Sequence, residues 1–149
     1  MIRVTFHIYI IALVMIFLVS CTPKGDEQSQ LRDSLTEIQN LLEAHELKKI
    51  LQHLDRDFLA QGRYGSAQLG QLMTLQFRQN QHLYVFLKNT EIQMQYPVAD
   101  IVTTAYLLGS KNVIPERGQR YEVKMRWLKV KDKWKLSRLH WQRASNQKP

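Results

Sequence analysis

The chain of 149 residues contains a single cysteine, Cys21. No disulfide can form within the chain, so its fold must be stabilised by ordinary core packing. The five histidines form no HxxxH pattern and no Cys/His cluster, and we therefore predict neither a metal nor a cofactor. Phosphate-binding loops, dinucleotide-binding fingerprints and Gly-x-Ser-x-Gly motifs are absent as well, which excludes the enzyme classes that depend on them.

The chain also lacks a hydrophobic run long enough to cross a bilayer comfortably as a helix. Residues 8–19 form an unbroken run of twelve apolar or aromatic residues after Arg3, which is short for a bilayer span and typical of a signal peptide. The run ends in Leu18-Val19-Ser20-Cys21, which resembles the lipobox of bacterial lipoproteins. This resemblance implies that signal peptidase II removes residues 1–20. It also implies that Cys21 carries a diacylglyceryl group on its thiol and an acyl chain such as palmitate on its amino group.

The lipobox also implies a location. Thr22, rather than Asp, follows Cys21, which resembles the enterobacterial signal for the outer membrane, with the domain facing the periplasm. The inner membrane is the alternative. We predict a lipidated cysteine and polar tether over residues 21–30, one compact domain over 31–144 and a flexible tail over 145–149.

Positive charge is concentrated in the last third of the chain. The formal net charge is +8, and residues 111–149 hold 12 Lys and Arg against 3 Asp and Glu, whereas residues 22–110 hold 8 against 10. The expected basic face comprises Lys124, Arg126, Lys129, Lys131, Lys133, Lys135 and Arg138. On a membrane surface such a face would meet anionic lipid or acidic polysaccharide, and we do not expect nucleic acid as a partner.

The hydrophobic period separates a helical half from a strand half. Helical spacing predicts helices over 31–42, 47–54 and 66–77, with a turn-rich connection over 55–65. The first two are separated by a bend near His45, and one long helix to about Leu54 is the alternative. A period of two predicts strands over 83–95, 98–108, 120–130 and 134–143, the last two joined by a tight turn at 131–133. Trp134 and Leu136 have the opposite parity to Leu139 and Trp141, which predicts a β-bulge near Ser137 or Arg138.

This order of elements predicts an α+β domain in which helices cover the concave side of a four-stranded antiparallel meander. The pattern resembles the NTF2-like fold, the cone shared by ketosteroid isomerase, SnoaL-type cyclases and scytalone dehydratase. The residues that carry the resemblance are Phe58, Tyr106, Trp127, Trp134, Lys135, Leu136 and Trp141. NTF2-like domains often pair through their sheets, so the resemblance leaves a homodimer open.

Acid–base residues are scarce where enzymes of this family keep them. The resemblance places the aspartate base of the isomerases near Gly62, which has no side chain, and no acidic residue occurs between Asp57 and Glu91. Asp100 is expected to be an exposed edge charge. We therefore expect a noncatalytic domain, with an isomerase or dehydratase that uses relocated acid–base residues as the alternative.

The aromatic residues of the strands suggest a ligand site. If the cone is open, Tyr84, Tyr106, Trp127 and Trp141 would line an apolar pocket. The leading hypothesis is an envelope lipoprotein whose domain binds a partner protein or an apolar ligand. Docking of the basic face on anionic lipid or polysaccharide is a further alternative.

Overall fold

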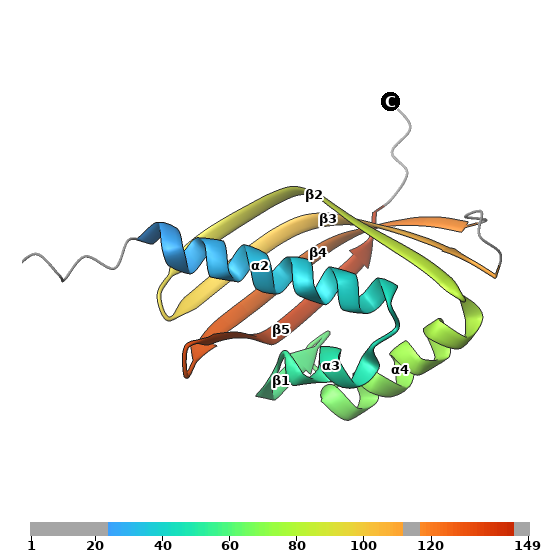
Figure 1. The fold of residues 1–149 in the computed structure, drawn as a ribbon, viewed down its shortest axis with the longest axis horizontal. Helices are drawn as coiled ribbons and strands as arrows, with labels where there is room; N and C mark the ends of the chain where they lie inside the picture. The colour runs from blue at the N-terminus through green and yellow to red at the C-terminus, as the bar shows by residue number, and fades with distance from the viewer. Residues whose placement is uncertain (1–23, 112–116, 145–149) are drawn as a thin grey trace, which may run out of the picture.

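The structure is a computed structural model, and it describes residues 24–111 and 117–144 (Figure 1). The predicted leader over 1–20, the lipidated Cys21 and the predicted tail over 145–149 lie outside the described residues. The helices are α2 (Lys24–Glu43), α3 (Leu47–Gln52) and α4 (Ser66–Gln79). The strands are β1 (Leu54–Ala60), β2 (His82–Gln95), β3 (Val98–Ser110), β4 (Arg117–Val130) and β5 (Lys133–Arg143). Of the described helices, none has the length and apolar character needed to span a membrane.

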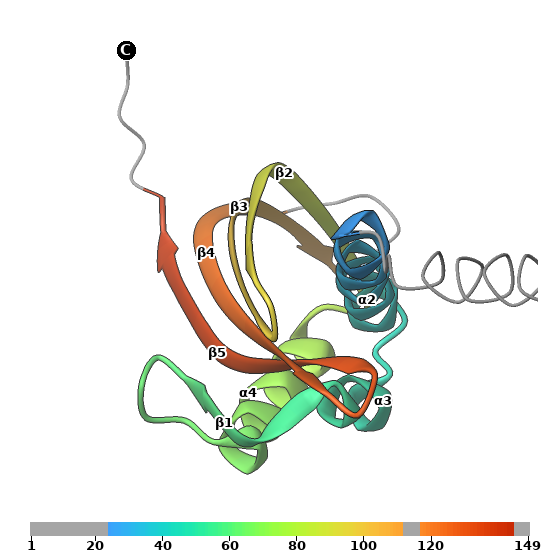
Figure 2. The ribbon, with the colours of Figure 1, turned by 90° about the vertical axis from the view of Figure 1, so that its left-hand side faces the viewer.

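One curved sheet organises the domain. The strand order is β1-β5-β4-β3-β2, in which β1 pairs with β5 in parallel and every other pair is antiparallel. Figure 2 shows the sheet curling around α2, while α3 and α4 lie beside β1. The predicted α+β architecture, with helices on the concave side of an antiparallel meander, is confirmed.

The core lies between the concave face and the helices. Along β3 the buried Ile101 and Thr103 alternate with Asp100 and Val102, which face outward. Trp127 of β4 is 0% exposed and packs in the same cluster as Leu31, Leu54, Phe58 and Leu136. This alternation follows from the two-residue period of a strand, so each strand gives the sheet an apolar inner face and a polar outer face.

The first helix begins earlier than predicted. Residues 24–30, expected to belong to the tether, form the first turns of α2. Lys129 from β4 donates hydrogen bonds to Glu27 Oε2 at 2.7 Å and Gln30 Oε1 at 2.5 Å, and Leu31 is fully buried. Tertiary contacts therefore hold a polar segment that shows no helical period of its own.

The predicted turn over 55–65 is also wrong in its first half. The second predicted helix, α3, ends at Gln52 rather than at residue 54. Leu54–Ala60 forms β1, a strand that adds to the four predicted strands. Leu54, Phe58 and Ala60 bury their side chains against the core, while Asp55 and Asp57 point toward solvent. Two aspartates disfavour a strand locally, so pairing with the distant β5 decides the conformation.

The β-bulge predicted in the last strand is confirmed. Arg126 pairs with Arg138 and Trp127 pairs with Leu136, which leaves Ser137 as the extra residue of β5. Because a strand alternates its faces, this single insertion lets Leu136 and Leu139 both face the core. The remaining elements match their predicted positions to within three residues at each end.

Candidate functional site: a cationic groove on the outer face of the sheet

Large exposed apolar side chains occur at three places in the described chain. They are Phe86 and Val102 on the outer sheet face, Tyr96 and Val130 near the two hairpin turns, and Leu72 and Leu75 on α4. Of these six, Val102 alone lines a cavity that also contains charged side chains. We therefore treat that face as the candidate site.

The cavity is a groove of about 310 Å³ that crosses β3, β4 and β5 and reaches the end of β1. Its apolar lining residues are Leu59, Ile101, Val102, Met125 and Leu139; of these, Ile101, Met125 and Leu139 belong to the core packing, and Val102 is the one that is exposed on β3. Its charged or titratable lining consists of Asp100, Lys124, Arg126, Arg138 and His140. Val102 is 43% exposed at a position where the neighbouring outward residues of the sheet are polar, so water can be displaced from it by a partner.

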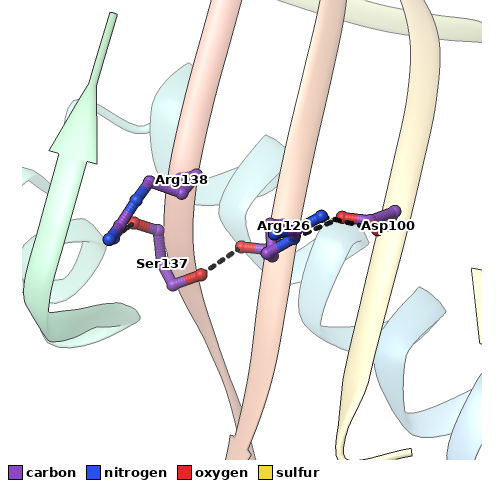
Figure 3. A network of polar contacts seen from close by, with 4 residues as sticks. All are labelled: Asp100, Arg126, Ser137 and Arg138. Carbon is purple, nitrogen blue, oxygen red and sulfur yellow. Dashed lines mark hydrogen bonds and ion pairs between the residues drawn. The ribbon is translucent and has the colours of Figure 1, made fainter. Parts of the chain in front are cut away.

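An ion pair occupies one side of the groove. The Arg126 guanidinium donates to both carboxylate oxygens of Asp100, from Nε at 2.8 Å and from Nη2 at 3.1 Å (Figure 3). The hydrogen bond and the negative charge of Asp100 both raise the pKa of Arg126. This two-point contact fixes the planes of both side chains across β3 and β4.

The bulge in β5 supplies the other side. Ser137 is buried, and its Oγ donates to the backbone oxygen of Arg126 at 3.0 Å. Arg138 Nη1 donates to the backbone oxygen of Ser137 at 2.7 Å (Figure 3). It also donates to the backbone oxygen of Asp57 at 2.8 Å. The bulge thus turns Arg138 outward and places it opposite Arg126, while His140 pairs with Lys124 one step further along.

The groove carries an excess of positive charge. Arg138 binds carbonyl oxygens rather than a carboxylate, and Lys124 makes no ion pair with any residue in 24–111 or 117–144. Asp100 neutralises Arg126, so Lys124 and Arg138 are left without a carboxylate partner beside the exposed Val102, with His140 in the same lining. This combination suits an acidic group attached to an apolar segment.

The structure divides the predicted basic face. Lys124 and Arg126 lie on the outer face, but the Lys129 side chain is only 5% exposed, pairs with Glu27 and lies over the Trp134 ring. Lys133 and Lys135 instead line a second, more polar cavity of about 410 Å³ between α2, α3 and the β4–β5 hairpin. Lys129 therefore does not belong to the predicted basic face, because the parity of β4 turns it toward α2. Lys133 and Lys135 alternate with the buried Trp134 and Leu136, as predicted for outward positions, and border the second cavity.

The predicted aromatic pocket is divided as well. Tyr84 and Tyr106 share the outer face with Phe86, whereas Trp127 is buried in the core and Trp141 is half-buried on the inner side of β5. The four aromatic rings do not meet around one cavity. Neither of the two cavities described above lies between α2 and Trp127.

The interior is poor in groups that could move a proton. Among the described residues, the buried polar residues are Thr103, Ser110 and Ser137, and every aspartate and glutamate is at least partly exposed. His45 is half-buried and stacks on Phe77, with its Nε2 buried and without a hydrogen-bond partner among the described groups. Within the same residues, no group of three or more His, Cys, Asp or Glu side chains could hold a metal ion. Acid–base chemistry in a dry pocket would require an ionisable group at such a position.

Several groove residues could not be identified from the sequence pattern. Leu59, Gly62 and His140 reach the site only through the pairing of β1 with β5 and through the bulge. Val102 had a detectable signal, because it is an apolar residue at an outward position of β3 between Asp100 and Thr104. Asp100, expected to be an edge charge, is instead the partner of Arg126.

Comparison with solved structures defines the fold. The chain superposes on Bd1075 of Bdellovibrio bacteriovorus with a TM-score of 0.72 and 16% identity, over 84% of this chain and 44% of that protein. It matches a proposed dehydratase of the NTF2-like family from Streptomyces avermitilis with a TM-score of 0.72 and 14% identity, over 83% of this chain and 99% of that one. A Nostoc punctiforme protein of unknown function with a cystatin-like fold matches with a TM-score of 0.65 and 15% identity, over 80% and 92%.

The chain thus has the NTF2-like, cystatin-like fold, as the sequence pattern predicts. It spans less than half of Bd1075. No model of a protein family and no curated protein matches the sequence. At these identities the similarity defines the fold alone, and the function has to be argued from the site.

Proposed function

We propose that this protein is a lipid-anchored, noncatalytic domain of the bacterial envelope, and that it binds an acidic, partly apolar segment of a partner protein in the outer groove. The lipobox ending at Cys21 supports the anchor, and Thr22 supports the outer membrane with the domain in the periplasm. The observation that carries the binding function is the exposed Val102 beside Lys124 and Arg138, which have no carboxylate partner among the described residues.

Two features favour binding over catalysis. The cations of the groove lie on an open sheet face, where water screens them and weakens any effect on a reacting group. The described interior, where the dehydratases and isomerases of this fold class would do their chemistry, contains the fully buried Trp127 and no buried carboxylate. An apolar ligand inside the cone would have to displace that packing.

Site-specific photocrosslinking tests the proposal. A photoreactive amino acid at Val102, introduced into the full chain in its native host, is expected to give one discrete crosslinked species in the envelope, because Val102 is exposed on the floor of the groove. The control is the same amino acid at Asn40, an exposed polar position on α2. Crosslinking at Asn40 to the same extent, or none at Val102, would contradict the proposal.

Charge reversal makes the test specific for the groove. Lys124→Glu is expected to lower the yield of the Val102 crosslink at least several-fold, since it replaces an unpaired cation by an anion next to Arg126. Lys48→Glu on the exposed side of α3 makes the same charge change elsewhere and should leave the yield unaltered. A crosslinked species with the mass of two copies of this chain would instead indicate a homodimer.

A further inference from the structure

The end of the domain at which α2 begins has an exposed surface with apolar and basic side chains. Figure 1 shows the start of α2, the β2–β3 turn and the β4–β5 turn together at one end of the molecule. Tyr96 in the first turn is 66% exposed, and Val130 beside the second turn is also exposed. Lys131 and Lys133 flank the same turn and are exposed as well. We call this surface, formed by Tyr96, Pro97, Val130, Lys131 and Lys133, the tip.

Hydrogen bonds connect the parts of the tip. The Lys129 backbone N–H donates to the Pro97 oxygen at 2.8 Å, which places the two turns side by side. The Lys129 side chain pairs with Glu27 Oε2 at 2.7 Å and so ties the β4–β5 hairpin to the first turn of α2. These contacts join the tip to the start of α2.

The chain outside the described residues fixes where this end of the domain lies. Cys21 precedes Lys24 by three residues. Three fully extended residues span about 10 Å, so a lipid on Cys21 keeps the start of α2 within about that distance of the bilayer surface. Because Glu27 is bound to Lys129, the β4–β5 turn has to stay near the membrane too.

We propose that the tip docks on the surface of the bilayer that holds the lipid anchor, and this inference rests on the proposed lipidation of Cys21. Tyrosine is favoured at the boundary between headgroups and hydrocarbon, since its ring is apolar and its hydroxyl remains hydrated. Lys131 and Lys133 exceed Asp132 by one positive charge, which attracts anionic headgroups. Each contact is weak, but the anchor gives it a high effective concentration.

Docking by the tip would set the height of the groove. The strands rise from the tip, and Val102 lies four residues after Val98 on β3, or about 13 Å along the strand. The groove would then open sideways above the headgroups, where a protein partner in the periplasm can reach it. Docking by another face would bury or tilt the groove.

A reconstituted anchor tests this orientation. The chain from residue 21 onward is coupled through the Cys21 thiol to a maleimide lipid in vesicles of phosphatidylethanolamine and phosphatidylglycerol. An environment-sensitive fluorescent amino acid replaces Tyr96 or, as the control, Asn40 near the far end of α2. We expect a blue shift of emission on coupling at position 96 and none at position 40. No shift at position 96, or an equal shift at position 40, would overturn the proposal.

A charge variant and a second readout complete the test. Combining Lys131→Glu with Lys133→Glu should reduce the shift at position 96, whereas Lys48→Glu with Lys49→Glu on α3 should not. A shift that survives the first pair unchanged contradicts the electrostatic part of the inference. Because the lipid is attached chemically, failure here is distinct from a failure of lipidation in the cell or of crosslinking at Val102.

Discussion

Deletion of Ser137 is expected to abolish the folded domain. Ser137 is the extra residue of β5. Because of it, even-numbered side chains such as Leu136 face the core before the bulge, and odd-numbered ones such as Leu139 face the core after it. Without it, Leu139 and Trp141 would turn to the outer face, and Arg138 and His140 would turn into the core. Burying an unpaired guanidinium costs several kcal/mol by itself, which is comparable to the stability of a typical domain.

The matched control is Ser137→Ala, which keeps the bulge. It removes only the hydrogen bond from Ser137 Oγ to the Arg126 oxygen at 3.0 Å and should cost about 1 kcal/mol. Circular dichroism and thermal unfolding of both variants check the expectation. A deletion variant that unfolds cooperatively within a few degrees of the wild type would contradict the role assigned to the bulge.

Replacement of Trp127 by alanine should give the second largest loss. Trp127 is 0% exposed at the centre of the core cluster, and truncation of a buried tryptophan costs about 3–5 kcal/mol. Its Nε1–H has no hydrogen-bond partner among the described groups, so removal of the indole also removes an unsatisfied donor. We therefore expect a loss near the lower end of that range, measured by urea unfolding.

Trp127→Phe separates packing from the unsatisfied donor. It keeps an aromatic ring in the core and removes the same Nε1–H, so its cost should be clearly smaller than that of alanine. A loss below about 1 kcal/mol for Trp127→Ala would mean that the interior is not packed around this residue. That result would favour the hypothesis that an apolar ligand binds inside the cone.

The sequence predicts those parts of the fold that depend on local periodicity. The alternation of Tyr121, Val123, Met125 and Trp127 identifies β4, and the parity change after Leu136 identifies the bulge. The start of α2 and all of β1 could not be predicted, because Lys129 and β5, which stabilise them, are far away in the chain. Periodicity contains no information on such pairings.

The groove was only partly visible in the sequence for the same reason. Lys124 and Arg126 are two residues apart on β4, so their shared face follows from strand geometry. Arg138 joins them only because the bulge restores its outward parity, and Asp100 joins through the register between β3 and β4. A count of lysines and arginines cannot separate these residues from Lys129, which is buried in an ion pair.

Mass spectrometry of the native protein tests the central claim most directly, because both the proposed location and the orientation of the groove depend on Cys21. Trypsin is expected to release a peptide that begins at Cys21, ends at Lys24 and carries a diacylglyceryl group and an amide-linked acyl chain. Protein from membranes that retains residues 1–20 and has a free Cys21 thiol would contradict the account.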